Sequence, residues 1–556
     1  MEQVLDGPLL RARLLGSNTA LTLSGIIAAL LVPSVIWIFS EEIVWPWDQA
    51  WYAEMALHLA HAAQDGPLAW AQAMLHAVTS KPPLLQWTGQ IAVPFAALLG
   101  SYERAFLLVN VAFNAATLAV VFSIVLRLGR SPLAAVAAVL LCGGASLFIG
   151  MSHQFFVEPA QALTVAGLMR LALEAGRLPT IRLAAATAIW VALAFLAKTT
   201  SVGFTVPLLA YIAVARFAAR RAPKPASTPA DLALVGLAVL LVAATAAWYG
   251  VNWPSVAAHI RNATMTEVAL HYGSIGTLGG KLAFWGSALL HALTPWTLLG
   301  YALAIVILTA LGSAAWRTLR LPARAWLAEA VTSGMLFAFC LAGTVAAGIL
   351  AYASQINEET RFLAPMIPLV AGLAGWSLAV LRRGWLTAAA TVLFATNAVA
   401  GHLHAHGVIA LPPAQTSVWL KPYRIEPDSV RRFERAVRLS CDPQNTHRHV
   451  VVGVERPDFN LNSAAFFSEK QKGALGYRCL YTSLGYAETD VERALKRIDI
   501  MDTQYFVTLP ADRLPADPND VLNQVSRPVA ERIAASPGWE RITEPSEPAQ
   551  VFRRRR

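Results

Sequence analysis

The residues best suited to chemistry lie in a loop that follows the first long apolar run. In this loop Asp48 stands among aromatic side chains that include Trp51 and Tyr52. Pro46 favours the first turn of a helix, so Asp48 would lie where the helix dipole stabilises an ionised carboxylate. A carboxylate at a partly dry interface is a suitable general base for a hydroxyl group. The alternative interpretation of Asp48 is a helix cap without a catalytic function.

Four more ionisable residues stand next to apolar runs, where charged groups are costly and often functional. They are Lys81, which precedes two prolines, and Glu158, Lys198 and Arg361. Convergent cations suit an anionic phosphate, whose charge grows as a bond to it breaks. We therefore expect Lys81, Lys198 and Arg361 to face a phosphate. The alternatives are pairing of these cations with neighbouring acids, snorkelling to lipid headgroups, and simple exposure of Glu158 in a loop.

The histidines are weaker candidates for a functional site. We assign His153 and His271 to the substrate pocket, together with Trp51 and Tyr52. Three histidines at alternate positions in 402–406 have side chains that can bind a metal ion. They are explained more simply as the end of an apolar run that enters a polar linker. We therefore predict no metal site from these histidines.

Composition indicates what must position these residues. Of the 556 residues 56% are hydrophobic and only 14% are charged, and the apolar residues form long runs without charge. Such runs are typical of helices that cross a membrane, because a hydrocarbon core of about 30 Å needs roughly 20 apolar residues. The net charge of +10 does not indicate nucleic acid as a partner, because the basic residues flank the apolar runs.

The apolar runs predict an all-α polytopic membrane domain with about 11–13 membrane-spanning helices. The basic loops all fall on one side of the membrane when the spans alternate. This is expected of cytoplasmic loops, so the N-terminus is predicted to be cytoplasmic and the candidate residues to lie outside. Eleven spans have assigned ranges, which are 20–39, 105–126, 131–150, 159–176, 183–197, 200–216, 232–249, 294–314, 330–352, 362–381 and 385–402.

We expect two domains in the chain. Residues 1–405 would form the membrane domain, and within it 41–104 would form a first outer loop with interfacial helices. Residues 406–556 would form a small soluble α/β domain. The expected helices of the first outer loop are near 47–63, 67–78 and 84–99.

The C-terminal segment alternates short apolar strands with helical periodicity. Residues 450–454 and 505–509 are typical of buried strands, and 488–498 between them has helical spacing. The segment contains no glycine-rich phosphate loop, so we expect an accessory role in acceptor binding or in covering the site. If this domain lies outside the cytoplasm, a disulfide between Cys441 and Cys479 is favoured.

The order of these motifs along the chain resembles a known family. The pattern is Asp48-x-x-x-Tyr52, then Lys81-Pro82-Pro83-Leu84, then Glu158, and finally Arg361-Phe362-Leu363-x-Pro365. This combination resembles the GT-C glycosyltransferases over roughly residues 15–405. It is most similar to the bacterial branch related to protein O-mannosyltransferases, glycosyltransferase family 39, and to the aminoarabinose lipid A transferase.

The resemblance implies transfer of a sugar from a polyprenyl (undecaprenyl) phosphate donor at the outer face of the bacterial inner membrane. The acceptor would be a lipid, a glycan or a protein, as in lipopolysaccharide or protein glycosylation. Asp48 then matches the base and Glu158 the second acidic residue, and the three cations match the donor-phosphate contacts. The C-terminal domain would be periplasmic, and transfer would invert the sugar. A divalent metal stays open as a cofactor.

Two positions depart from the pattern of the aminoarabinose enzymes. Those enzymes usually carry Asp-Glu-x-Arg-Tyr, where this chain has Gln49 and Trp51, and a Glu before Lys-Pro-Pro, where it has Ser80. The sequence therefore indicates a reaction class and leaves the sugar and the acceptor open.

Two alternative functions remain for the chain. One is a polytopic transporter, which would usually place polar groups at mid-membrane. The other is a polysaccharide polymerase or ligase with a pyrophosphate-linked donor.

Overall fold

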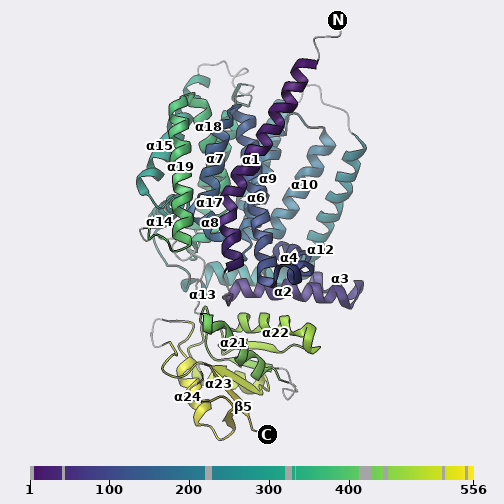
Figure 1. Cartoon of the computed structure of the whole chain (residues 1–556), viewed down its shortest axis with the longest axis vertical. Coiled ribbons are helices and arrows are strands. Elements are labelled where there is room, and N and C mark those ends of the chain that lie inside the picture. Colours follow the sequence, from purple (N-terminus) through teal and green to yellow (C-terminus); the bar gives the residue numbers. More distant parts are fainter. Residues whose placement is uncertain are drawn as a thin grey trace. The chain divides into compact units, whose positions relative to one another are not determined.

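The computed structural model is mainly helical and ends in a small sheet (Figure 1). The chain forms two compact units. The first unit comprises Met1–Phe39, Thr79–Leu84 and Leu107–Pro422, and the second comprises Ser40–Val78, Leu85–Phe106 and Tyr423–Arg556. The residues that the structure describes are 6–40, 44–219, 228–319, 329–331, 333–411, 427–442, 449–515, 520–544, 547 and 549–555.

The first unit is a bundle of apolar helices (Figure 1). Among the described residues, nine helical segments are long and apolar enough to cross a membrane. They are α1 (Asp6–Ser40), α6 (Tyr102–Gly129), α10 (Thr180–Ala197), η2 (Thr199–Ser201) with α11 (Val202–Ala218), α12 (Pro229–Met265), α15 (Thr297–Thr318), α17 (Met335–Ala353), η3 (Thr360–Leu363) with α18 (Met366–Leu381), and α19 (Gly384–Ala405). Shorter helices of this unit are α7 (Pro132–Gly143), α8 (Ser146–Met151), α9 (Glu158–Glu174), α13 (Glu267–Leu270) and α14 (Leu278–Leu293).

The predicted all-α polytopic membrane fold is confirmed, and all eleven expected spans coincide with helices. Two of these expected spans correspond to helices shorter than 18 residues. The expected span 131–150 is divided into α7 and α8, which are separated at Gly144. A Cβ on Gly144 would lie only 2.7 Å from the Cβ of Ala398 in α19, so the close approach of α19 requires glycine there. The expected span 159–176 corresponds to α9, which has 17 residues.

Helix α18 is the most enclosed of the candidate spans in the described part of the chain. It packs against α7, α9, α15 and α17. A Cβ on Gly375 of this helix would lie 2.7 Å from the methyl groups of Val125 in α6 and 2.9 Å from the Cβ of Ala138 in α7. Small residues allow helices in a membrane to approach closely, so Gly375 sets the spacing of three helices.

The second unit contains the short helices that follow α1. They are α2 (Trp47–Asp65), α3 (Pro67–His76), α4 (Leu84–Ala92), η1 (Val93–Phe95) and α5 (Ala96–Leu99). The predicted helices near 47–63, 67–78 and 84–99 are confirmed. Pro67 opens α3, which agrees with the preference of proline for the first turn of a helix.

The C-terminal part of the second unit is an α/β fold, as predicted. Its sheet has the order β2-β1-β3-β5-β4, in which β1 pairs in parallel with β2 and β3, whereas β5 pairs antiparallel with β3 and β4. The strands are β1 (His449–Val452), β2 (Leu480–Ser483), β3 (Tyr505–Thr508), β4 (Trp539–Arg541) and β5 (Gln550–Arg554). The helices are α21 (Pro427–Ser440), α22 (Leu461–Leu475), α23 (Val491–Ile500) and α24 (Ser526–Ala535).

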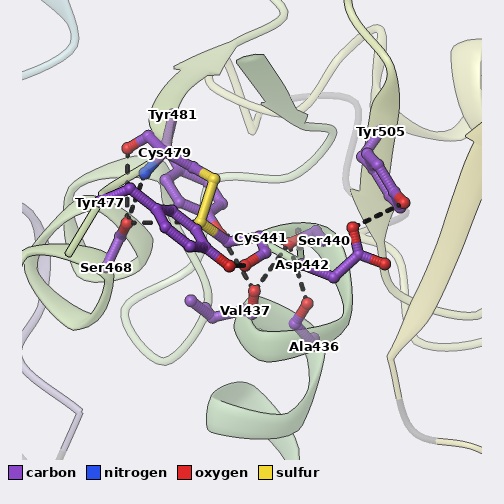
Figure 2. Close-up of a disulfide and its surroundings, with 10 residues drawn as sticks. All are labelled: Ala436, Val437, Ser440, Cys441, Asp442, Ser468, Tyr477, Cys479, Tyr481 and Tyr505. Carbon is purple, nitrogen blue, oxygen red and sulfur yellow. Dashed lines mark hydrogen bonds between the residues drawn. A yellow bond between two sulfur atoms is a disulfide. The ribbon is translucent and has the colours of Figure 1, made fainter. Parts of the chain in front are cut away.

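A disulfide joins Cys441, at the end of α21, to Cys479, before β2 (Figure 2). The predicted pairing is therefore confirmed. Their Cα atoms are 5.8 Å apart, and both residues are buried in the core of the α/β fold.

The boundary between the two units differs from the expected boundary between 405 and 406. The sequence places the first outer loop with the membrane helices, whereas the structure groups most of it with the C-terminal fold. The physical reason is packing of α2 along α22. Just before α2, the ring of Trp45 stacks on Phe466 of α22 with a centroid distance of 5.8 Å.

Candidate active site

Glu158 is the centre of a buried ionic cluster in the first unit. It opens α9, and its side chain is only 1% exposed. The ammonium Nζ of Lys198 donates a hydrogen bond to Glu158 Oε1 at 2.7 Å, and Nε of Arg361 lies 3.7 Å from the same oxygen. The structure therefore brings together three of the residues that the sequence selects.

Lys198 and Arg361 both stand at breaks between helices. Lys198 has extended backbone between α10 and η2, and Arg361 lies in η3 immediately before α18. Nζ of Lys198 is 3.8 Å from the centre of the Phe362 ring, and Cζ of Arg361 is 4.6 Å from the centre of the Phe156 ring. Such cation–π contacts offset part of the hydration that a buried cation loses.

The charges of this cluster balance. Arg361 also donates to Oε2 of Glu359 at 2.9 Å, so two cations face two carboxylates. Each of the four side chains is at most 15% exposed, and charges that are buried in this way are stable only when they are paired. An incoming phosphate would therefore compete with Glu158 for Lys198 and Arg361.

Two buried amides join the segments around this cluster, and sequence reasoning missed both. Asn110 of α6 donates to the carbonyl oxygens of Gln154 and Phe156 at 2.7 and 3.1 Å, which fixes the turn that leads into α9. Gln161 of α9 donates to Oγ of Ser201 in η2 at 3.1 Å. The available signal was a polar residue inside an apolar run, because such a residue needs a buried partner.

Lys81 lies in the short segment before α4 and is half-buried, and the two prolines that follow it are buried. The prolines restrict the backbone of this segment, as the sequence indicates. The expected contact between Lys81 and a phosphate stays a prediction.

The two histidines assigned to the substrate pocket lie in different surroundings. His153 is buried, with its ring 4.9 Å from Trp37 in an edge-on contact and 6.0 Å from His406. His271 follows α13, is half-buried, and contacts the ring of Tyr272 at 4.8 Å. Their assignment to a substrate pocket stays a prediction. Among the described residues, no group of three or more His, Cys, Asp and Glu side chains is arranged to hold a metal ion.

Asp48, Trp51 and Tyr52 belong to the second unit. Asp48 lies in the first turn of α2, as predicted, and the capping position is occupied by Pro46. Trp47, between them, has a positive φ of 35°, a strained conformation for a bulky residue and one that often occurs at functional sites. Tyr52 is buried, and the centre of its ring is 5.4 Å from that of Trp51.

Solved structures with the same architecture exist at low sequence identity. ArnT from Cupriavidus metallidurans in the apo state is 13% identical over 95% of this chain and 96% of its own, with a TM-score of 0.55. The same protein bound to undecaprenyl phosphate is 14% identical, with a TM-score of 0.55. The archaeal oligosaccharyltransferase AglB from Archaeoglobus fulgidus, in complex with an inhibitory peptide and a dolichol-phosphate, is 13% identical over 95% of this chain and 74% of its own, with a TM-score of 0.52.

The chain has the GT-C fold. A third GT-C protein, the arabinofuranosyltransferase AftD from Mycobacteria, is 15% identical over 96% of this chain and 39% of its own, with a TM-score of 0.50. No protein-family model matches the chain, and no curated protein sequence matches it. The predicted GT-C architecture is therefore confirmed as a fold.

Sequence reasoning missed a second ionic cluster in this GT-C chain, which lies wholly within the second unit. Glu54, His58 and His61 of α2 lie on the side of the helix where Glu469 of α22 is buried. Glu54, His58 and His61 are separated by four and three residues, which places their side chains on one face of the helix. This spacing is the feature of the sequence that could have indicated the cluster. The carboxylate of Glu469, which both histidines face, is 408 residues from His61, so no local pattern could identify it.

Proposed function

We propose that the protein transfers a sugar from a polyprenyl-phosphate donor to a hydroxyl group of a lipid, glycan or protein acceptor. The observation that carries this proposal is the convergence of Lys198 and Arg361 on one buried carboxylate, at helix ends of a GT-C fold. Two neighbours support the donor class, since ArnT was solved with undecaprenyl phosphate and AglB with a dolichol-phosphate.

The two cations suit the phosphate of such a donor. Before the donor binds, Glu158 keeps Lys198 and Arg361 paired in a buried environment. The phosphate then replaces Glu158 as their partner, with Lys81 as a third cation. When the bond from the sugar to the phosphate breaks, negative charge on the phosphate increases, and the cations stabilise this charge more strongly than that of the bound donor.

Asp48 acts as the base in this proposal. The acceptor hydroxyl gives its proton to the Asp48 carboxylate, and the hydroxyl oxygen forms a bond with the anomeric carbon. The bond between that carbon and the phosphate oxygen breaks, and its electron pair leaves with the phosphate. The configuration of the sugar inverts, because attack and departure occur on opposite faces. The disulfide of the C-terminal fold favours an oxidising compartment, which agrees with a reaction on the periplasmic side.

The test uses the full chain in lipid nanodiscs with a sugar linked to undecaprenyl monophosphate. Released undecaprenyl phosphate and glycosylated acceptor are measured by mass spectrometry for a pentose and a hexose donor. We expect Asp48→Asn to lower turnover by about 100-fold or more, because general-base catalysis contributes roughly that factor. Asp65→Asn, at the exposed end of the same helix, is the matched control and should retain activity. Normal turnover by Asp48→Asn would exclude this mechanism.

A binding measurement tests the role of the two cations. Undecaprenyl phosphate should bind Lys198→Ala about 10-fold more weakly than the unchanged protein, and Arg361→Lys should also weaken binding. Arg177→Ala removes an exposed ion pair near the opposite end of α9 and should leave binding unchanged.

Release of lipid pyrophosphate from a pyrophosphate-linked oligosaccharide, without turnover of the monophosphate donor, would favour a polymerase or ligase. Substrate movement across the membrane without bond cleavage would favour a transporter.

A further inference from the structure

Helix α2 carries three ionisable residues on the face that packs against α22. They are Glu54, His58 and His61, whose spacing aligns them along one side of the helix. Nδ1 of His61 lies 2.8 Å from Oε1 of Glu469, and Nδ1 of His58 lies 3.7 Å from the same oxygen. The side chain of Glu469 is completely buried, and its carboxylate links the middle of α2 to α22.

The second oxygen of Glu469 is used by the α/β fold itself. Arg478 donates to Oε2 of Glu469 at 2.9 Å and lies 3.5 Å from Oε1 of Glu54. Burial opposes the ionised form of Glu469, but the neighbouring His58, the hydrogen bond with His61 and the charge of Arg478 hold its pKa below the usual range. Glu469 is therefore a charged bridge between one helix of the first outer loop and the C-terminal fold.

The bridge adjoins the disulfide-linked part of the fold in the sequence. Arg478 directly precedes Cys479, and Glu469 directly follows Ser468. The backbone N–H of Cys479 donates to Oγ of Ser468 at 2.8 Å. The two partners of the ion pair are thus neighbours of two residues that are fixed to each other. This hydrogen bond ties together the two backbone segments that carry Glu469 and Arg478.

A second set of contacts with α22 holds the chain just before Asp48. Trp45, which precedes α2, stacks on Phe466, and its carbonyl oxygen accepts a hydrogen bond of 2.6 Å from Ser463. Ser463, Phe466 and Glu469 are spaced by three residues along α22. Helix α22 therefore holds the chain at Trp45, three residues before Asp48. Through Glu469 it holds α2 again at His61, about 20 Å beyond Asp48 at a rise of 1.5 Å per residue.

We propose that Glu469 is a positioning residue: it fixes the position and rotation of α2, and thereby holds Asp48 in the geometry that the transfer reaction requires. This inference rests on the proposed function, because it takes Asp48 as the base. A base must be held within a fraction of an ångström of its productive position, and an α-helix that is held at two points along one face can neither rotate nor slide freely.

The first arm of the test measures α2 directly and needs no substrate. In the full chain, amide hydrogen exchange of residues 47–65 is followed by mass spectrometry. His61→Leu removes the bridging nitrogen, whereas His61→Asn can place an amide nitrogen near the position of Nδ1. We expect α2 to exchange at least 10-fold faster in His61→Leu and in Glu469→Gln than in the unchanged protein, and near-normal exchange in His61→Asn. Strands β1 and β3 should be unaffected.

Glu434→Gln is the matched control for this arm, because it removes a carboxylate from an ion pair with Arg438 on the surface of α21. It should leave the exchange of α2 unchanged. Equal protection of α2 in His61→Leu and His61→Asn, or unchanged protection in Glu469→Gln, would overturn the proposal whatever the activity is. If Glu469→Gln also exposes the sheet, the two His61 variants decide the outcome.

The second arm measures catalysis with the undecaprenyl monophosphate sugar. A positioning role predicts that Glu469→Gln lowers kcat about 10-fold or more and leaves the KM for the donor unchanged. In the Asp48→Asn background the same change should have no further effect, because Glu469 acts through Asp48. An equal loss in both backgrounds would overturn the proposal. If α2 loosens as expected while Asp48→Asn keeps full activity, the assignment of Asp48 as the base fails and the structural role of Glu469 stands.

Discussion

At the scale of single residues, Glu158 and Glu54 differ in how their buried carboxylates are compensated. Glu158 has two cations within 4 Å, Lys198 and Arg361. Glu54 shares the single guanidinium of Arg478 with Glu469, and Arg478 is closer to Glu469. Burial raises the pKa of Glu54 to about 8, and the charge of Glu469 adds to this effect, while Arg478 offsets only part of it.

This pKa predicts a pH dependence for the attachment of α2. Because the pKa of Glu54 in the fold lies above its ordinary value of 4.5, its contribution to stability is fully present below about 4.5 and is lost as pH rises through about 8. We expect the protection factors of α2 amides to fall about 10-fold or more between pH 5 and pH 8.5.

The measurement compares the unchanged protein with Glu54→Gln, which imitates the protonated carboxyl group at every pH. The variant should retain its protection at pH 8.5, apart from changes due to His58 and His61, which face the same cluster. An equally steep fall in both proteins would show that Glu54 is not the titrating group.

At the scale of elements, the candidate site depends on how closely the helices around α18 approach one another. Arg361 precedes this helix, and Glu158 begins α9, which packs against it. At Gly375 the methyl groups of Val125 and the Cβ of Ala138 leave no room for a side chain. Ala138 cannot give way by changing rotamer, because its Cβ is attached directly to the backbone.

We therefore expect Gly375→Ala to destabilise the membrane unit by about 1–3 kcal/mol, the usual cost of overpacking. The matched control is Gly312→Ala in α15, where a Cβ would meet nothing within 4 Å. That substitution should be neutral or slightly stabilising, because alanine favours a helix more than glycine does. Thermal unfolding of the purified protein in detergent checks the pair, and equal Tm values in the two variants would contradict the close-packing argument.

At the scale of the whole molecule, each of the two compact units is built from three separate segments of the chain, so no single point in the sequence divides them. The first outer loop and the C-terminal segment form one unit, in which α2 packs on α22 and one disulfide closes a loop of the α/β fold. Such a disulfide stabilises a fold mainly by restricting the unfolded chain. The α/β fold should therefore depend on oxidation, whereas the membrane helices should not.

We expect reduction of the disulfide, or the double change Cys441→Ser with Cys479→Ser, to destabilise the α/β fold by about 2–4 kcal/mol. Limited proteolysis of the full chain measures this, and cleavage within the C-terminal residues should become several-fold faster. The half-buried Cys340 is free, so Cys340→Ala should respond to reductant as the unchanged protein does. Loss of the reductant effect in Cys340→Ala would show that this cysteine, and not the disulfide, is responsible.

Local patterns were sufficient for much of this molecule. Runs of apolar residues identified the membrane helices, and Pro46 marked the first helix that follows α1. They failed at Gly144, where α7 ends and where the approach of Ala398 leaves no room for a Cβ, because that approach involves residues 254 positions apart. Strands β2, β4 and β5 were not predicted, because each mixes polar and apolar residues, whereas the predicted strands β1 and β3 contain mainly apolar runs.

The sequence by itself determined which residues are costly to place beside a membrane, and so it selected Glu158, Lys198 and Arg361 and predicted the pairing of the two cysteines. Only the tertiary structure decided that both cations share one carboxylate, and that Glu469 joins α2 to the C-terminal fold. The physical reason is that the cost of burying a charge depends on one residue and its neighbours along the chain. The partner that offsets this cost is brought close only by the fold, across 40 residues for Lys198 and 408 for His61.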